Sequence, residues 1–278
     1  MAFGGASVRE ALDSAVIAIA AAGSETPRLD AEVLLAAALG IDRTALFLDP
    51  AREVTGSAVR AFQDAVRRRS AGREPVAYIT GTRGFRHIEL AVDARVLVPR
   101  PETELLVEAG AELLPRGARV ADVGTGSGAV ALALKDERPD LDVTATDASA
   151  DALVVARANA ARLGLHVAFR HGDLLAGAGE LDAVLSNPPY VAEGERATLA
   201  PEIVRHEPPG ALFAGTDGLD VIRRLVPAAA AAGARLLAVE VGAGQAAAVA
   251  TLMHEASFRD VKARRDLAGV ERVVVGRR

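Results

Sequence analysis

The sequence predicts an α/β fold in which a doubly wound, Rossmann-like parallel sheet follows a small N-terminal helical domain. After Gly117, short apolar segments alternate with amphipathic helical segments, the pattern of a parallel sheet with helices on both faces. Over the first 70 or so residues, apolar residues recur at helical spacing and no strand pattern occurs. A glycine-rich loop also follows the first strand of the alternating part, where doubly wound sheets bind nucleotides.

The N-terminal helices begin and end at recognisable capping residues. Ser7 and Glu10 have the spacing of a capping box, which opens a helix that Gly23 closes. Further helices are expected over Pro27–Leu39, Arg43–Leu48 and, approximately, Ser57–Ala71. The run Arg67-Arg68-Arg69 on the last of these suits a solvated helix face better than a contact patch.

From Pro75 the period of the apolar residues changes from helical to alternating. Val76–Thr80 is expected to be a strand, 81–84 a turn, and 88–92 a second strand, together forming a hairpin. The expected organisation is a helical domain over residues 1–73, a β-hairpin linker over 74–98, and a sheet domain over 99–278.

The sheet domain is expected to begin with a helix at Pro101 and to continue as alternating strands and helices. The expected strands are 119–123, 143–146, 167–170, 181–186, 235–241 and two near Val261 and Val273; the expected helices are 129–135, 149–163, one from about Leu219, and 245–255.

The composition excludes several classes of function. The chain has 278 residues, a net charge of -5 and an aromatic content of 3%, so it lacks the basic and stacking surfaces on which nucleic-acid binding depends. It has no cysteine, and its five histidines show no metal-ligand spacing, so no metal site is expected. Without a long apolar run or a signal-peptide pattern, we expect a cytoplasmic protein that does not contact membranes.

The loop Gly124-Thr125-Gly126-Ser127-Gly128 and the acidic residue Asp147 together predict a nucleoside cofactor site. Glycines allow a tight turn and a close approach of the backbone to a ligand. Asp147 ends the second strand, where a carboxylate can accept hydrogen bonds from both ribose hydroxyls; its alternative role is to cap the next helix beside Ser149. These features do not distinguish among cofactors, since the loop also satisfies the dinucleotide fingerprint.

The segment His171-Gly172-Asp173-Leu174 ends the third strand, where an adenine ring would lie if its ribose contacts Asp147. Asp173 is then expected to accept a hydrogen bond from the adenine amine, and Leu174 to cover the ring. The alternative is a plain turn at Gly172-Asp173.

A proline-containing corner, Asn187-Pro188-Pro189-Tyr190, ends the fourth strand. Neither proline can donate a backbone hydrogen bond, and each pushes the residue before it toward extended geometry, so the backbone is stiff. The Asn187 side chain and the Pro188 carbonyl offer two acceptors beside the aromatic ring of Tyr190. Such a corner can bind a planar amide or amine that bears two N–H bonds.

These residues resemble the peptide chain release factor glutamine methyltransferases, over nearly the whole chain. The corner matches the signature of S-adenosylmethionine-dependent methyltransferases that act on exocyclic or amide nitrogens. The other matching segments are Glu74–Ile79, Pro99–Glu104, Asp122–Gly128, Arg205–Pro208, Asp217–Asp220 and Asp266–Gly269.

The resemblance implies a class I methyltransferase domain, S-adenosylmethionine as cofactor and S-adenosylhomocysteine as product. It implies methylation of the glutamine amide in the Gly-Gly-Gln motif of class I release factors. Gly124 to Gly128 would hold the methionine portion, Asp147 the ribose, Asn187 both cofactor and substrate, and Pro188 to Tyr190 would complete the glutamine pocket. The family commonly has tryptophan directly after the aspartate at 173; this chain has Leu174, an aliphatic surface that can still exclude water.

Three other readings of the sequence remain open. An adenine methyltransferase acting on DNA or RNA would use the same corner, although the chain has no basic groove. A nicotinamide-dependent dehydrogenase would use the glycine loop and leave Asn187 without a role. A non-catalytic module would bind a protein through its helical domain. For the methyltransferase we expect a monomer that does not bind nucleic acid directly.

Overall fold

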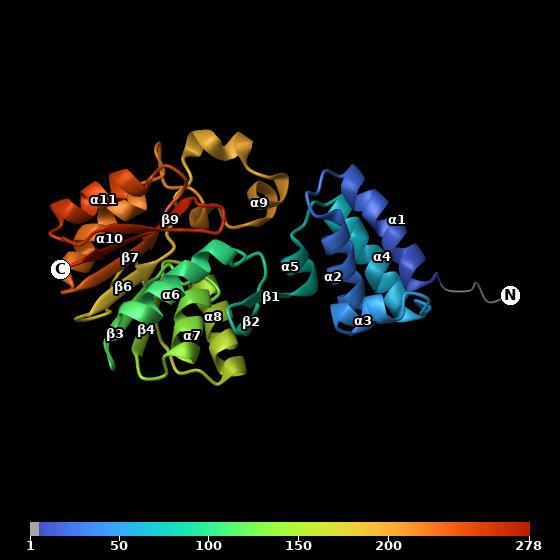
Figure 1. Cartoon of the computed structure of the whole chain (residues 1–278), viewed down its shortest axis with the longest axis horizontal. Helices are drawn as coiled ribbons and strands as arrows, with labels where there is room; N and C mark the ends of the chain where they lie inside the picture. Colours follow the sequence, from blue (N-terminus) through green and yellow to red (C-terminus); the bar gives the residue numbers. More distant parts are fainter. Residues whose placement is uncertain (1–5) are drawn as a thin grey trace. The chain divides into compact units, whose positions relative to one another are not determined.

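The computed structural model describes residues 6–278, which form two compact units (Figure 1). The first unit comprises the chain up to Gly81 together with Ala200–His206. The second comprises Thr82–Leu199 and Glu207–Arg278. A short segment from the second half of the sequence therefore belongs to the helical unit.

The first unit is helical, as predicted. Ser7 and Glu10 form the expected capping box at the start of the first helix, and buried side chains of the longer helices share one apolar core. The helices are α1 (Val8–Ala21), α2 (Pro27–Leu39), α3 (Arg43–Leu48), α4 (Ser57–Ser70), α5 (Val76–Thr80) and α9 (Pro201–His206).

A buried ion-pair cluster lies within this helical unit. Arg69 of α4 donates to Asp30 of α2 at 2.7 Å, and each side chain is less than 10% exposed. Arg69 and Arg73 also pair with Glu202 of α9, so ion pairs hold α9 in this unit. Arg69 thus points into the unit, which corrects the expectation that all three arginines of its run are solvated; Arg67 is 76% exposed.

The segment Val76–Thr80 is a helix, so the prediction of a strand there is wrong. Its β-branched residues suggested a strand, but the Pro75 carbonyl accepts hydrogen bonds from the Tyr78 and Ile79 amides and starts a single helical turn. Gly81, in the left-handed conformation at φ 78°, ends it. The hairpin is present but begins later, with β1 (Thr82–Phe85) pairing antiparallel to β2 (Ile88–Ala91).

A seven-stranded sheet organises the second unit, with strand order β5-β4-β3-β6-β7-β9-β8. Strands β3 to β7 are parallel. Strand β9 pairs antiparallel with both β7 and β8, because a short turn joins β8 to β9 and reverses the chain. The sheet is therefore mostly, not wholly, parallel. Its strands are β3 (Arg119–Val123), β4 (Asp142–Asp147), β5 (Ala168–His171), β6 (Ala183–Ser186), β7 (Leu236–Glu240), β8 (Lys262–Arg265) and β9 (Glu271–Arg277).

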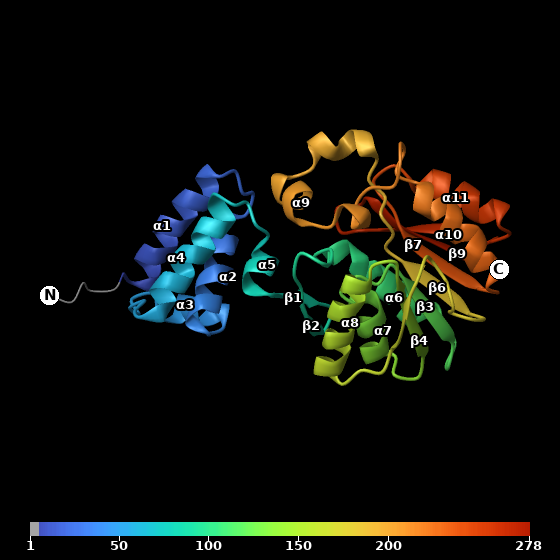
Figure 2. The same cartoon turned by 180° about the vertical axis from the view of Figure 1, so that it is seen from behind.

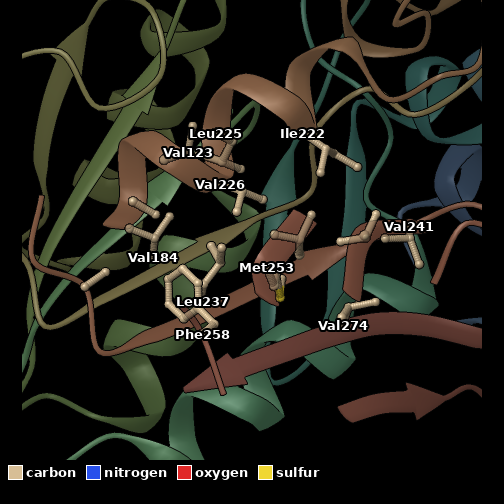
Figure 3. Packing of buried hydrophobic residues seen from close by; sticks show 14 of the residues in the cluster. Val123, Val184, Ile222, Leu225, Val226, Leu237, Val241, Met253, Phe258 and Val274 are labelled. Carbon is tan, nitrogen blue, oxygen red and sulfur yellow. The ribbon is translucent and has the colours of Figure 1, made fainter. Parts of the chain in front are cut away.

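Helices cover both faces of this sheet (Figure 2). On one face pack α6 (Glu104–Leu113), α7 (Ala129–Glu137) and α8 (Ala150–Leu163); on the other pack α10 (Asp220–Ala231) and α11 (Ala246–Glu255). Figure 3 shows the core beneath α10 and α11, where Ile222, Leu225 and Met253 meet apolar side chains of the strands. The helix expected from Pro101 begins with a 3₁₀ turn, η1 (Pro101–Thr103), directly before α6; the short 3₁₀ helices η2 (Glu193–Thr198) and η3 (Pro209–Ala211) were not expected.

Within residues 6–278, no helix is long and apolar enough to cross a membrane. The same residues contain no group of three or more His, Asp or Glu side chains arranged to hold a metal ion.

Candidate active site

A cavity of about 490 Å³ lies in the second unit at the carboxyl ends of the parallel strands. Strand β3 lies between β4 and β6, so the strand order reverses beside it, which is where open α/β sheets bind ligands. Most of the predicted site residues meet in its wall: Gly124, Thr125, Gly126, Ser127, Asp147, Asp173, Leu174, Asn187, Pro188 and Pro189. Gly128 and Tyr190 are not wall residues of this cavity.

The glycine loop connects β3 to α7 in a conformation that requires glycine. Gly124 and Gly128 have φ of 72° and 87°, and a Cβ on Gly128 would lie 2.8 Å from the Leu132 Cδ1 atom. The amides of Gly124 and Thr125 donate to the Thr146 carbonyl, and the Gly128 amide donates to the Thr125 carbonyl. These hydrogen bonds fix the conformation of the loop at the carboxyl end of β3.

Asp122, two residues before the loop, is a buried carboxyl group that the sequence reasoning did not assign to the site. Its Oδ2 accepts hydrogen bonds from the Thr125 hydroxyl at 2.6 Å and from the Ala131 amide at 3.1 Å. Burial raises its pKa to about 6, against the effect of these two hydrogen bonds. Asp122 therefore joins the loop to the first turn of α7 and adds negative charge to the cavity wall.

Asn159 of α8 fixes the loop from the side, which the sequence did not indicate. It is fully buried, and its Nδ2 donates to the Ser127 carbonyl at 2.9 Å. Its Oδ1 accepts from the Ala91 amide at 2.8 Å, so one side chain links the hairpin strand β2 to the loop. A single polar residue on a predicted helix carries no pattern from which this role could be found.

Asp147 ends β4 and lies in the cavity wall, as expected. Its Oδ2 accepts from the Gly126 amide at 2.9 Å and its Oδ1 from the Ser149 amide at 2.8 Å. The helix cap that was the alternative role for Asp147 is formed instead by Ser149, whose side chain accepts from the Ala152 amide at the start of α8. Each carboxylate oxygen keeps a second lone pair that a bound ribose can use.

Asp173 and Leu174 follow β5 and lie in the wall of the same cavity. Leu174 has φ 49°, its carbonyl accepts from the Thr146 hydroxyl at 2.6 Å, and its side chain packs partly buried against the apolar core. Asp173 forms an exposed ion pair with Arg224 of α10, another wall residue that the sequence reasoning missed. Their contact with an adenine stays a prediction.

The corner after β6 is held next to the glycine loop. The Ser186 hydroxyl donates to the Val123 carbonyl at 2.7 Å, and a Cβ on Gly124 would lie 3.9 Å from the Asn187 carbonyl oxygen. The Asn187 Nδ2 donates to the Thr103 hydroxyl at 3.0 Å. This contact leaves the Asn187 Oδ1 as the acceptor that the side chain can offer to a ligand.

Tyr190, the last residue of the corner, lies outside the cavity wall. Its hydroxyl donates to the Glu240 Oε1 at 3.2 Å, and burial raises its pKa, so the ring stays neutral. Its carbonyl accepts from the Gln245 Nε2 at 2.9 Å. A Cβ on Gly218 would lie 2.1 Å from the same carbonyl oxygen, so only glycine fits there. Side chains from two other segments therefore hold the aromatic end of the corner.

Glu240 is the site residue that the sequence reasoning missed most clearly. It is 1% exposed, and burial raises its pKa to about 7. A signal existed, since Glu240 is a charged residue at the end of a fully apolar strand, and the carboxyl ends of parallel strands carry the ligand site.

The wall residues fit a nucleoside that carries a positive charge. Asp147 offers a carboxylate to a ribose, while Asp122 and Asp147 supply negative charge for a cationic centre. The volume of about 490 Å³ is within the usual range for sites of small ligands.

Comparison with known proteins agrees with this geometry. Residues 10–81 match the family described as PrmC N-terminal domain, and residues 101–249 match the methyltransferase small domain. Two solved structures share the fold at a TM-score of 0.51: a methyltransferase from Pyrococcus furiosus (17% identity; 68% of this chain, 87% of that chain) and a T. thermophilus 16S rRNA methyltransferase in complex with AdoMet and guanosine (19%; 71% and 49%).

Full-length relatives extend the match. The release factor glutamine methyltransferase of Deinococcus radiodurans is 45% identical, with 98% of each chain covered. That of Mycolicibacterium smegmatis is 42% identical, also with 98% of each chain covered. With the cavity described above, these matches show that this chain is an S-adenosylmethionine-dependent enzyme and belongs to the release factor glutamine methyltransferase family.

Proposed function

We propose that the enzyme methylates the side-chain amide nitrogen of the glutamine in the Gly-Gly-Gln motif of class I peptide chain release factors. The observation that carries the proposal is the Asn187-Pro188 corner, which lies in the wall of the cofactor cavity with the Asn187 Nδ2 bound to Thr103. The two remaining acceptors, Asn187 Oδ1 and the Pro188 carbonyl, match the two N–H bonds of a primary amide.

The cofactor-binding residues follow from the cavity wall. We propose that Gly124, Thr125, Gly126 and Ser127 hold the methionine portion, partly in the space that the missing side chains of the glycines leave, while Gly128, outside the cavity wall, keeps the loop in its conformation. Asp147 accepts from the ribose hydroxyls, and Asp173 with Leu174 contacts the adenine. When bound, the cofactor supplies an electrophilic methyl group on a positively charged sulfur.

The chemistry required of the protein is mainly alignment. An amide nitrogen is a weak nucleophile because its lone pair is delocalised into the carbonyl group. Two hydrogen bonds from the substrate NH₂ to Asn187 and Pro188 fix the direction of the nitrogen. They also strengthen as positive charge develops on that nitrogen, which lowers the barrier. Pro189 completes the pocket, and Tyr190, outside the cavity wall, supports the end of the corner.

The division of labour along the chain is also proposed. Residues 1–73 dock the release factor, 74–98 form a linker, and 99–278 carry out methyl transfer. The helical unit has exposed apolar side chains suited to docking, among them Phe47 at 55% and Leu48 at 81%. We further propose that the enzyme works in the cytoplasm as a monomer and does not contact nucleic acid directly.

The reaction is tested by incubating the enzyme with a class I release factor and radiolabelled S-adenosylmethionine, then mapping the modified residue by mass spectrometry. A single methyl group on the glutamine of the Gly-Gly-Gln motif is the expected result. Label in DNA or RNA and none in the release factor would favour the adenine methyltransferase reading and overturn the proposal.

Docking is tested by replacing Phe47 and Leu48 with serine. The double variant should raise KM for an intact release factor by about tenfold or more, since burial of one such side chain contributes about 1.5–3 kcal/mol. KM for a short Gly-Gly-Gln peptide should not change. Val154→Ser, at an equally exposed apolar residue of the second unit (55%), is the matched control. An unchanged KM for the intact protein would show that these residues do not dock it.

A further inference from the structure

A primary amide side chain can face a partner with either end, because its oxygen and nitrogen are nearly equal in size. If Asn187 turned its NH₂ group toward the cavity, it would present donors to a substrate NH₂ group, which also donates. The proposed function therefore depends on something that holds the Asn187 amide in one orientation.

Two buried residues are placed to set this orientation: Thr103, in the cavity wall, and Glu240, outside it. Thr103, at the end of η1, is 4% exposed and accepts a hydrogen bond from the Asn187 Nδ2 at 3.0 Å. The Thr103 hydroxyl also lies beside the Glu240 carboxylate and favours its ionised form, which opposes the rise in the pKa of Glu240. The Tyr190 hydroxyl occupies the Oε1 atom of Glu240 at 3.2 Å.

The donors and acceptors in this chain can be assigned from their chemistry. An ionised carboxylate only accepts, so a hydroxyl beside it must donate its one proton to it. The Thr103 oxygen is then left as an acceptor, and the group of Asn187 that can donate to it is the NH₂ group. We infer that Thr103 and Glu240 are positioning residues for methyl transfer: they hold the Asn187 amide with its carbonyl oxygen available to the substrate.

The unsatisfied oxygen of Glu240 supports a functional role. In the part of the chain that the structure describes, its Oε2 is buried without a hydrogen-bond partner. A buried carboxylate oxygen without a full partner destabilises a fold. A carboxylate in this position is better explained by what it does to Thr103 and Tyr190 than by stability.

The charge of Glu240 should control the orientation. Glu102 disfavours the ionised form, and Arg272 of β9 favours it, while Tyr190 stays neutral. Burial outweighs the favourable contacts and places the pKa of Glu240 at about 7. Once protonated, Glu240 can donate to Thr103, whose hydroxyl is then free to donate to the Asn187 oxygen. The amide could turn, and turnover should fall as the pH decreases through about 7.

The inference rests on the proposed function, and the variants are chosen to separate the two. Thr103→Val keeps the shape and removes the hydroxyl, whereas Thr103→Ser restores a hydroxyl. Asn187→Ala tests the proposed site itself. For each, kcat and KM are measured with a Gly-Gly-Gln peptide at saturating cofactor, and affinity for S-adenosylhomocysteine is measured by calorimetry.

Thr103→Val should lower kcat by roughly 10- to 100-fold, the scale of a small misplacement of a reacting group, with KM and cofactor affinity nearly unchanged. Thr103→Ser should recover kcat to within about threefold of the wild type, since its hydroxyl makes the same two hydrogen bonds. A wild-type kcat in Thr103→Val, or equal loss in Thr103→Ser, overturns the positioning role if Asn187→Ala is inactive. A fully active Asn187→Ala instead overturns the proposed site.

A pH profile gives a readout that a structural role would not change. In the wild type, kcat should rise with pH and level off above about 7, the pKa of Glu240. Glu240→Gln cannot ionise, so its kcat should be lower at pH 8 and nearly independent of pH between about 6 and 8. An unchanged acid limb in Glu240→Gln would mean that another group, such as Asp122, sets the profile, and would overturn the role of Glu240.

Discussion

Replacement of Asp147 tests the cofactor site most directly, and the structure shows what else the change removes. In the proposed complex, Asp147→Ala loses two hydrogen bonds from ribose hydroxyls to a charged acceptor, each worth roughly 1.5–3 kcal/mol. The sum of about 3–6 kcal/mol corresponds to a 10²- to 10⁴-fold loss of affinity. Because Asp147 is partly exposed, we expect the lower end, about 100-fold.

The same substitution also has a structural cost. Asp147→Ala removes the acceptor for the Gly126 and Ser149 amides, at 2.9 and 2.8 Å. At about 0.5–1.5 kcal/mol for each hydrogen bond, the free energy of unfolding should fall by roughly 1–3 kcal/mol. Asp147→Asn keeps an acceptor for one of the two amides and removes only the charge, so its loss of cofactor affinity should be nearer to tenfold.

The assay is calorimetric titration with S-adenosylhomocysteine, with thermal unfolding of each variant measured in parallel. Asp151→Asn is the matched control, because Asp151 is an exposed carboxylate in the first turn of α8 and is not part of the cavity wall. Its affinity should match the wild type. If Asp147→Ala binds the product as tightly as the wild type, Asp147 serves the glycine loop alone and the ribose assignment is wrong.

Three further predictions concern Asn187, the ion-pair cluster of the helical unit and Glu240. Asn187→Ala should lower the single-turnover rate by roughly 10²–10³-fold, as for loss of one preorganised hydrogen bond, while Asn187→Asp keeps an acceptor and should retain measurable turnover. Equal rates for Asn187→Ala and the wild type would make the corner a structural turn. Arg69→Ala should lower the free energy of unfolding of the helical unit by about 3–5 kcal/mol, whereas Arg67→Ala, at an exposed ion pair, should cost less than about 1 kcal/mol. Urea unfolding measures both, and similar losses would contradict the buried cluster. Glu240→Gln should reduce the loss of stability between pH 5 and pH 8.

The elements of the sheet were predictable because their signals are local. Each parallel strand is a short apolar run, and capping residues such as Ser149 and glycines such as Gly164 mark the helix ends. The site at the carboxyl ends of β3, β4, β5 and β6 followed from the same rules, and the cavity wall contains ten of the twelve predicted residues. Local chemistry therefore brought most of the predicted residues to one cavity, while their roles there stay predictions.

The supports of the site were not predictable, because they join residues far apart in the sequence. Asn187 and Thr103 are 84 positions apart, and Tyr190 and Glu240 are 50 apart. No period or motif links such pairs; they meet only after the sheet has brought η1, β6 and β7 together. The error at Val76–Thr80 has the opposite cause, since β-branched residues favour a strand while Pro75 and Gly81 bracket one helical turn.

The two buried carboxyl groups near the cavity reduce the stability of the fold at neutral pH. Burial raises the pKa of Asp122 from 3.8 to about 6 and that of Glu240 from 4.5 to about 7. Between the ordinary and the raised pKa of each group, the native state binds more protons than the unfolded state. The free energy of unfolding therefore falls as pH rises from about 4 to about 7.

Glutamine at position 240 cannot ionise, so the variant should lose less stability over that range, and Asp122 should account for the decline that remains. Melting temperatures of both proteins between pH 5 and pH 8 measure the difference, and an identical decline would show that Glu240 is not the group that titrates. A variant that is relatively more stable at pH 8 yet slower in methyl transfer would show that the buried charge serves the reaction at the expense of the fold.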